Sequence, residues 1–212
     1  MLKVWGRATS SNVQKVMWAI AELNLPHERV DVGGAFGGLD TPAYRAMNPN
    51  GLIPVIEDGG TVLWESNAIV RYLAGKYGAG GLSPADAGTR AVADQWMDWV
   101  LTTLGPAFMQ IFVSVIRTPP SKQDPKAMAA AAANTGRVLG ILDARLAKST
   151  FVAGPALTMG DLPLGPILFR YFTLEIERPS LPNLEAYYTR LTEQPNFRKH
   201  VMISYESLRA KD

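Results

Sequence analysis

The segment from Asn48 to Leu73, which reads NPNGLIPVIEDGGTVLWESNAIVRYL, constrains the fold more than any other part of this chain. A proline leads into a short apolar run, a Gly-Gly turn follows, and a second apolar run ends at a polar helix start. Two such runs around a glycine turn predict a β-hairpin, and the serine before the next apolar-periodic stretch predicts the beginning of a helix. Few folds need a hairpin and a helix in this order within so short a stretch.

The residues before this segment predict two parallel strands joined by a helix. Apolar side chains recur at helical spacing between the two strands, so the connecting helix has one buried face. The result is a βαβ unit with a right-handed crossover. Followed by the hairpin and its helix, it makes the βαβββα order of a thioredoxin-like domain. We expect strands over residues 2–6, 27–32, 54–57 and 61–64, and helices over residues 12–24 and 66–77.

The pattern changes at a glycine-rich stretch that begins at Gly78. Beyond it the apolar spacing is helical throughout, which predicts an all-helical domain. We expect residues 1–78 to form the thioredoxin-like domain, residues 79–85 to be a linker and residues 86–212 to form the helical domain. Helices are expected over residues 86–117, with a bend at Gly105–Pro106, and over residues 125–148, 160–172, 184–191 and 197–208.

Composition excludes several classes of site. The 212 residues include no cysteine, which excludes disulfides, thiolate metal sites and a cysteine nucleophile. Any thiol chemistry must therefore use a thiol that belongs to a ligand. The two histidines, His27 and His200, are too few for a histidine-rich metal site, so we expect no metal. The net charge of +2 comes without a block of lysine and arginine, which argues against a nucleic-acid partner.

The sequence also predicts a protein that is not associated with a membrane. The first residues lack the long apolar stretch of a signal peptide. No uninterrupted apolar run approaches the ~20 residues needed to span a bilayer. We therefore expect a cytoplasmic protein.

The Ile53–Pro54 step is the first candidate for binding. Proline cannot donate a hydrogen bond to a neighbouring strand, so Pro54 suits the start or the edge of a strand. A cis bond would turn the backbone N–H and C=O of Ile53 outward, where they can pair with an extended peptide as an added strand. A trans proline that merely begins an edge strand explains the same residues.

A second candidate lies at the junction of the hairpin and its helix. Glu65 ends a predicted strand and Ser66 begins a predicted helix. The free N–H groups of a first helical turn and a serine hydroxyl can together hold a carboxylate. Ser66 can also be a helix cap that satisfies only its own backbone.

The third candidate is the hydroxyl-rich loop from Thr9 to Asn12, between the first strand and the first helix. Ligands of such sheets lie beyond the strand ends, near loops of this kind. A donor on Ser10, Ser11 or Asn12, aided by the helix dipole, can stabilise a thiolate. This stabilisation lowers the pKa of the thiol below its reference value of ~8.5. An N-capping box explains the same residues equally well.

Found together and in this order, these motifs resemble the cytosolic glutathione transferases, in particular bacterial serine-type members similar to the theta and phi classes. The resemblance covers essentially the whole chain. It is strongest over Asn48–Leu73, with Asn-Pro-Asn-Gly-x-Ile-Pro-Val and Trp-Glu-Ser-Asn-Ala-Ile. A further similarity is the family's capping box in the helical domain, where Thr158 would cap and Asp161 would reach back.

The resemblance implies a first domain that binds glutathione as co-substrate and a helical domain that helps to bind a hydrophobic electrophile. Ser10 matches the residue that faces the glutathione sulfur, and the flanking Ser11 and Asn12 are the next candidates for this catalytic role. No metal takes part in this chemistry.

The resemblance also implies which residues hold the tripeptide. Ile53, followed by Pro54, matches the residue whose backbone pairs with the cysteinyl part of glutathione. Glu65 and Ser66 match the pair that holds the γ-glutamyl end.

The chain departs from the family pattern at the glycyl carboxylate. Several plant-type relatives carry basic residues near positions where this chain has Leu39 and Asp40. Arg45 and Lys15 are the alternative cations considered for that contact.

Aromatic and apolar residues are candidates for the electrophile pocket. Phe36 lies on a glycine-rich loop, whereas Phe108, Met109 and Phe112 lie on a predicted helix. Helical apolar stripes of this kind also form ordinary cores. Relatives of this family dimerise, so a homodimer is expected.

Three functions fit the sequence. The leading hypothesis is a glutathione S-transferase that conjugates the glutathione thiolate to hydrophobic electrophiles. The second is glutathione-dependent reduction of disulfides or peroxides, with a second glutathione supplying the thiol. The third is a binding or regulatory protein that keeps the fold without the catalysis.

Overall fold

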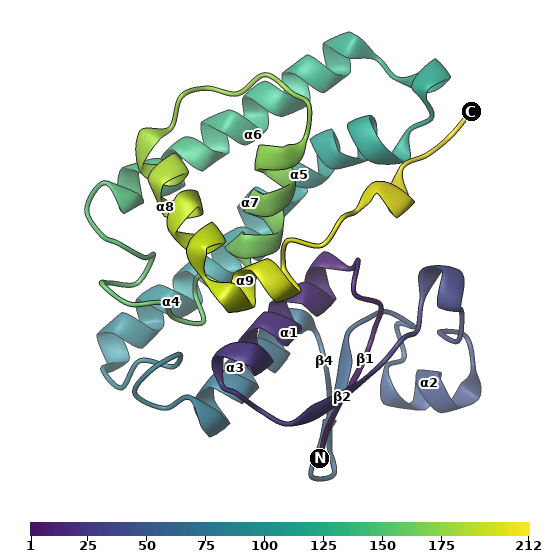
Figure 1. The fold of residues 1–212 in the computed structure, drawn as a ribbon, viewed down its shortest axis with the longest axis vertical. Helices are drawn as coiled ribbons and strands as arrows, with labels where there is room; N and C mark the ends of the chain where they lie inside the picture. Colours follow the sequence, from purple (N-terminus) through teal and green to yellow (C-terminus); the bar gives the residue numbers. More distant parts are fainter.

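The computed structural model describes residues 1–212, and its first part is a four-stranded mixed sheet with three α-helices (Figure 1). The strand order is β2-β1-β3-β4. Strand β1 is parallel to β2 and antiparallel to β3, and β3 is antiparallel to β4. The elements are β1 (Leu2–Trp5), α1 (Ser11–Glu22), β2 (His27–Val30), α2 (Pro42–Met47), β3 (Val55–Asp58), β4 (Thr61–Trp64) and α3 (Ser66–Tyr77).

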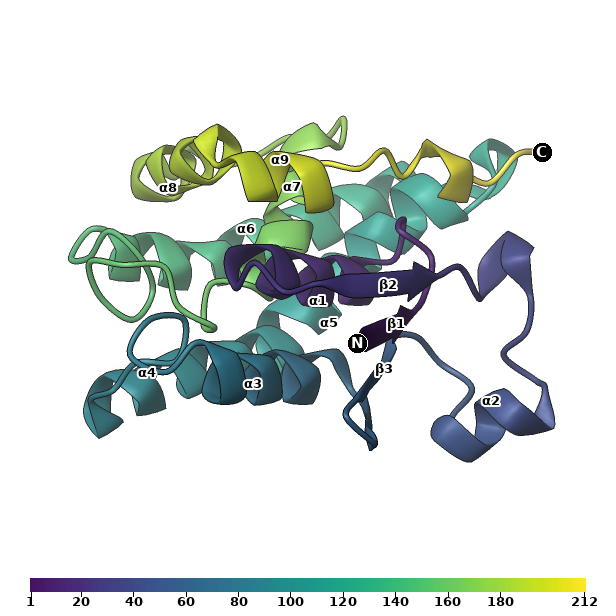
Figure 2. The same cartoon turned by 60° about the horizontal axis from the view of Figure 1, so that its bottom comes forward.

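The remainder of the chain is helical, as the sequence predicts. Figure 2 shows the yellow-green helices from the end of the chain above α1, and α3 and β3 below it. This architecture, a thioredoxin-like βαβββα domain followed by helices, is the expected fold class. The main helices are α4 (Ala87–Trp99), α5 (Gly105–Phe112), α6 (Pro125–Leu146), α7 (Leu164–Thr173), α8 (Pro182–Glu193) and α9 (Pro195–His200).

Helix α1 lies at the centre of the molecule. It packs against α3 on one side and against α7 and α9 on another. All eight residues from Val13 to Ile20 are buried, so α1 lacks the solvent-facing stripe that an amphipathic helix has. Packing from both halves of the chain therefore fixes where α1 begins, and with it the position of the loop before α1.

The chain forms a wide, π-helical turn just before Gly105–Pro106, where the sequence predicts a bend. Between α4 and α5, residues Val100–Leu104 form a π-helical turn, and the N–H of Gly105 donates to the carbonyl of Val100. A β-carbon at Gly105 would lie 2.8 Å from that carbonyl oxygen, so the turn needs glycine there. Pro106 follows this glycine. Because proline has no backbone N–H, no hydrogen-bond donor is left without a partner at this position.

The helix that runs from Ala87 to Arg117 bears on the expectation about the membrane. By length and composition alone this helix could cross a bilayer. Most of its polar residues are uncharged, and its most apolar stretch of 18 residues has a mean hydropathy of 1.7. The buried share of that stretch is 44%. Core helices of soluble proteins pass the same test, so this one helix is weak evidence for a membrane span.

Two helix boundaries differ from the expected ones. Helix α7 begins at Leu164 rather than at residue 160, because residues 158–163 form the turn that Asp161 organises. The final expected helix, over residues 197–208, ends at His200. Beyond it the chain continues as a loop with one short 3-10 turn, Glu206–Leu208.

Asp161 is fully buried and joins three segments of the helical domain. Its Oδ2 accepts from the N–H of Thr158 at 2.8 Å and from the Thr158 hydroxyl at 3.1 Å. Its Oδ1 accepts from the N–H of Val152 at 3.0 Å and from the Tyr187 hydroxyl at 2.8 Å. One half of the predicted box is present, because the Asp161 carboxylate reaches back to Thr158 and also contacts Val152 and α8. The other half is not, because Thr158 does not cap a helix: its hydroxyl accepts from the N–H of Gly160 at 3.3 Å, and α7 begins only at Leu164.

We predict that Asp161→Asn lowers the free energy of unfolding by roughly 2–4 kcal/mol, because the amide NH2 would face buried donors and leave them unpaired. Urea denaturation monitored by circular dichroism measures the change. Asp212→Asn is the matched control at an exposed carboxylate and should leave the unfolding curve in place. Equal curves for Asp161→Asn and the parent protein would contradict the structural role of Asp161.

Candidate functional site

A cavity of about 460 Å³ lies between the loop before α1 and the helical domain. A larger hollow of about 720 Å³, between α6 and residues 175–181, contains none of the predicted site residues. The smaller cavity contains the hydroxyl loop and part of the predicted apolar pocket. Its lining consists of Arg7, Thr9, Ser10, Ser11, Asn12, Lys15, Val100, Leu101, Gly105, Pro106, Phe108, Met109, Phe112, Arg117, Ile167, Arg170 and Leu208.

Ser10 occupies the N-cap position of α1 without acting as a cap. Its backbone is extended, its side chain makes no capping hydrogen bond, and its carbonyl accepts from the N–H of Gln14 at 2.9 Å. The hydroxyl of Ser10 is therefore free to donate to a ligand in the cavity. Ser11, the first residue of α1, also lines the cavity and makes no side-chain hydrogen bond within the protein.

The loop that carries Ser10 is held from both sides. The Arg170 guanidinium on α7 donates to the carbonyl of Thr9 at 2.9 Å. The side chain of Gln14 donates to the carbonyl of Ala8 at 3.1 Å, and the N–H of Ser10 donates to the carbonyl of Arg7 at 3.2 Å. These contacts orient the loop before any ligand binds.

Ser66 belongs to a polar network that reaches this loop. Its hydroxyl donates to Asn12 Oδ1 at 3.3 Å and accepts from Lys15 Nζ at 3.4 Å. Asn12 and Ser66, predicted to serve different parts of the tripeptide, are thus neighbours. Lys15, which the sequence offered as a cation for the glycyl carboxylate, lies beside Ser66, a residue predicted to hold the γ-glutamyl end.

Glu65 has a backbone conformation that a non-glycine residue rarely adopts. Its φ is 70° and its ψ is 110°, at the junction of β4 and α3. Such a conformation costs of order 1–3 kcal/mol and persists only where the surroundings determine it. The carboxylate of Glu65 is exposed and makes no hydrogen bond within the protein, so it is available to a ligand.

Ile53 presents an unpaired stretch of backbone. Its N–H and C=O make no hydrogen bond within the protein, and the Ile53–Pro54 bond is cis. The preceding carbonyl, of Leu52, accepts from the Tyr44 hydroxyl and from the Asn48 side chain, both at 2.8 Å. The backbone before Ile53 is therefore fixed, while Ile53 itself keeps a free donor and a free acceptor.

The apolar wall of the cavity comes mainly from α5. Phe108, Met109 and Phe112 line it, whereas Phe36 does not. Phe36 lies on the 3-10 turn Gly34–Phe36, and its side chain is 59% exposed. The structure therefore brings three of the four predicted pocket residues together. Sequence spacing alone could not exclude Phe36, because a turn in a glycine-rich loop carries no packing signal.

Four cationic side chains line the cavity. The sequence did not predict that they would lie together. Arg7, Lys15, Arg117 and Arg170 come from the β1–α1 loop, α1, the end of the α4–α5 helix and α7, and no acidic residue joins them. The pKa of Arg170 is lowered to about 10, mainly by burial and to a smaller extent by Arg117 and Arg7, against an opposing effect of Tyr205. These residues are too far apart in the sequence for any local motif to reveal them.

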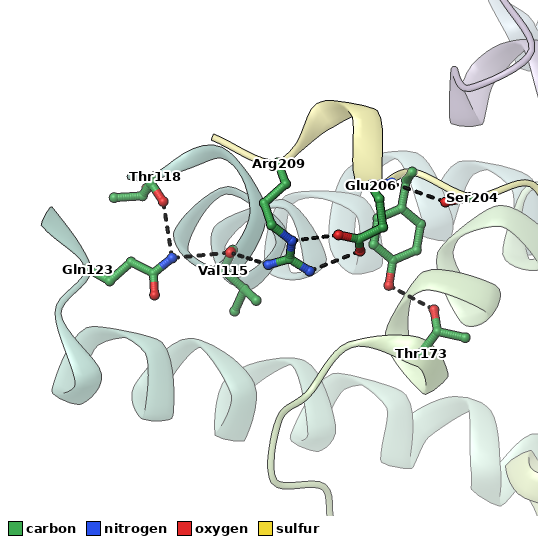
Figure 3. Close-up of polar contacts among 8 residues, drawn as sticks. Val115, Thr118, Gln123, Thr173, Ser204, Glu206 and Arg209 are labelled. Atoms are coloured by element: carbon green, nitrogen blue, oxygen red, sulfur yellow. Dashed lines mark hydrogen bonds and ion pairs between the residues drawn. The ribbon is translucent and has the colours of Figure 1, made fainter. Parts of the chain in front are cut away.

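The C-terminal segment closes one end of the cavity. Leu208 lines it, and the Tyr205 ring packs edge-on against Phe112 at 5.6 Å. The close-up in Figure 3 shows Arg209 paired with Glu206 and reaching the carbonyl of Val115, which also accepts from Gln123. The segment is thus tied to the helix that carries Phe108 and Phe112.

Arg45 does not lie in this cavity. Its guanidinium donates to the carbonyl of Pro49 at 2.8 Å and packs against Gly51. The cation considered for the glycyl carboxylate is therefore engaged with its own loop.

Two protein-family models match the chain. The model described as "Glutathione S-transferase, N-terminal domain" matches residues 9–76, and "Glutathione S-transferase, C-terminal domain" matches residues 92–195. Together they cover more than half of the chain and include Ser10, Ile53, Glu65 and Ser66.

Full-length relatives give the same result. The chain is 40% identical over 205 residues to the glutathione S-transferase GstB of Escherichia coli (strain K12), a match that covers 96% of this chain and 99% of that protein. It is 30% identical over 208 residues to glutathione S-transferase 3 of Zea mays, with 94% and 93% covered.

A solved structure is similar over nearly the whole length. It is the theta class glutathione S-transferase from the citrus canker pathogen Xanthomonas axonopodis pv. citri, with glutathione bound. The TM-score is 0.91 at 46% sequence identity, and the match covers 96% of this chain and 98% of that one.

We predict that Lys15→Met raises the free energy of unfolding of the ligand-free protein by roughly 1–3 kcal/mol. Burial lowers the pKa of Lys15 from 10.5 to about 8, despite an opposing effect of Glu65, so the charged amine opposes folding. The gain in the free energy of unfolding should have its full value below pH 8. It should become smaller as the pH rises toward 10.5, because the lysine is then neutral in both the folded and the unfolded protein.

Denaturant titrations at several pH values measure this gain. Lys126→Met, at an exposed lysine of α6, is the matched control and should show no such pH dependence. A Lys15→Met protein that unfolds at lower denaturant concentration than its parent would contradict the prediction.

Proposed function

The chain belongs to the glutathione S-transferase family, and we propose that its cavity joins the thiolate of glutathione to electrophiles held against Phe108, Met109 and Phe112. It is a glutathione S-transferase. The observation that carries the assignment of roles is the hydroxyl of Ser10, which stands at a helix N-terminus, faces the cavity and is not used as a cap.

Ser10 stabilises the thiolate in this proposal. Lowering the thiol pKa by ~2 units needs ~2.7 kcal/mol of preference for the charged form. A hydrogen bond to a charged acceptor supplies ~1.5–3 kcal/mol, and the N-terminus of α1 adds a favourable dipole. The hydroxyl and the helix end are together sufficient. Ser11 and Asn12 are the alternatives, although Asn12 already accepts from Ser66.

Glutathione lies extended along Ile53 in this proposal. The free N–H and C=O of Ile53, beside Pro54, pair with the cysteinyl residue as an added strand would. The γ-glutamyl end reaches Glu65 and Ser66. Support for this comes from the exposed carboxylate of Glu65, the first turn of α3 and the amine of Lys15 next to Ser66.

The two halves of the chain have different roles in this proposal. We assign glutathione binding to residues 1–78 and the electrophile pocket to residues 86–212, with residues 79–85 as the linker between them. We also propose that the protein acts as a homodimer, as the family resemblance implied, and, as the sequence itself led us to expect, that it is cytoplasmic and works without a metal.

We predict that Ser10→Ala raises the apparent pKa in the pH dependence of kcat/KM by ~1–2 units, because the thiolate loses a charged-acceptor hydrogen bond. Ser11→Ala is the matched comparison in the same loop and should shift the profile less. An unchanged profile for Ser10→Ala would remove Ser10 from this role and move the role to Ser11 or Asn12.

We expect conjugation to exceed reduction. With 1-chloro-2,4-dinitrobenzene the wild-type protein should form the glutathione conjugate, and with bis(2-hydroxyethyl) disulfide or a peroxide its rate over background should be much smaller. Spectrophotometric assays at equal glutathione concentration measure both. Reductase turnover without conjugation would favour the alternative of a glutathione-dependent reductase. Calorimetry that detects no glutathione binding at millimolar concentration would favour the non-catalytic alternative.

A further inference from the structure

The electrophile side of the cavity carries positive charge that the protein does not neutralise. Arg117 and Arg170 come from the helical domain and line the cavity together with Arg7. The guanidinium groups of Arg7 and Arg117 make no hydrogen bond or ion pair within the protein. Burial lowers the pKa of Arg7, and repulsion from Arg117 adds to this effect. No aspartate or glutamate belongs to the lining.

Arg170 is the most confined of these cations. Only 4% of its surface is exposed. One nitrogen donates to the carbonyl of Thr9, while the buried Nε has no partner. The guanidinium lies 5.4 Å from the centre of the Phe112 ring and 5.9 Å from that of Tyr205. The aromatic rings attract the cation without neutralising it, and a buried charge without a counter-ion is costly.

The nearby carboxylates are already used. Glu206, on the C-terminal segment that walls the cavity, pairs with Arg209 at 2.6 Å (Figure 3). Asp212 accepts from the backbone N–H and the hydroxyl of Ser121. Glu65 does not line the cavity; its charge acts on Lys15, and its carboxylate is the group assigned above to the γ-glutamyl end of glutathione. A ligand would therefore have to supply the negative charge that the arginines of the cavity lack.

We propose that the preferred electrophile carries a carboxylate on an apolar body, with the body against Phe108 and Phe112 and the carboxylate held by Arg117 and Arg170. A planar guanidinium suits a carboxylate because it can donate two parallel hydrogen bonds. The proposal rests on the proposed transferase function and adds a charge requirement that hydrophobic pockets alone do not impose.

The reaction balances with such a substrate. For an aryl chloride, glutathione first gives its thiol proton to solvent. The thiolate then forms a bond to the ring carbon, and chloride leaves with the bonding electron pair. The carboxylate of the substrate is unchanged throughout, so the arginines position the electrophile and take no part in the bonds that form or break.

A matched pair of substrates tests the proposal. 4-Chloro-3-nitrobenzoate and 4-chloro-3-nitrobenzamide have similar shape and the same leaving group, and only the benzoate is charged. With each rate divided by its uncatalysed rate, wild-type kcat/KM should favour the benzoate by roughly tenfold. Added salt should reduce this preference, because Arg117 is partly exposed and its charge is screened.

Arg117 is the position to vary, because Arg170 also holds the Ser10 loop. Arg117→Gln should lower the benzoate-to-benzamide ratio by roughly three- to tenfold, and Arg117→Lys should retain part of it. Arg137→Gln removes the same charge from an exposed arginine of α6 outside this cavity and should leave the ratio at its wild-type value.

The outcomes separate this proposal from the transferase assignment. A wild-type preference for the benzamide, or an unchanged ratio in Arg117→Gln, would overturn the proposal while conjugation of the benzamide still supported the transferase. A raised KM for glutathione in Arg117→Gln, at an unchanged ratio, would assign the arginine to glutathione and overturn the proposal as well. A wild-type protein that neither binds glutathione nor conjugates the benzamide would overturn the transferase roles themselves.

Discussion

The packing of α1 between the two halves of the chain is the interaction on which the site depends. Trp18, fully buried, meets Phe197 of α9 edge-on at 5.1 Å. Gly165 of α7 lets the helices approach closely, because a β-carbon there would lie 2.6 Å from the Trp18 ring. These contacts fix α1 against the helical domain. Ser10, one residue before α1, is therefore placed by packing at residues that never touch the cavity.

The burial of α1 also means that the site holds polar and charged side chains in apolar surroundings. A helix packed on every side has little room for polar residues, yet Gln14 and Lys15 lie within its buried stretch. Their polar ends reach the Ser10 loop and Ser66. A protein selected for stability alone would place apolar residues there. The cavity thus keeps positive charge at a cost in stability, and an anionic ligand recovers that cost when it binds.

The sequence predicted the parts of the site that depend on local structure. The helix start at Ser66, the step at Ile53–Pro54 and the hydroxyls before α1 each follow from residue type and neighbouring pattern. The fold class followed from the order of these elements. The contact between Asp161 and Thr158 was also predicted, because the two residues are three positions apart.

The remaining parts could not be predicted because they depend on contacts between distant segments. Arg170 meets the carbonyl of Thr9 across 161 positions of sequence, and Lys15 meets Ser66 across 51. The start of α7 was misplaced for a related reason. Local spacing favours a helix from residue 160, but Asp161 is held by Val152 and by Tyr187 of another helix.

Arg170 links the two halves of the site physically. One end of its guanidinium supports the loop that positions Ser10, and the rest faces the cavity that would receive the electrophile. A guanidinium has five N–H donors, so one nitrogen can keep the bond to Thr9 while the unpaired Nε meets an anion. In the proposed arrangement a single rigid side chain would therefore contact both the second substrate and the loop that carries Ser10. The apolar wall, which makes only non-directional contacts, cannot provide such a link.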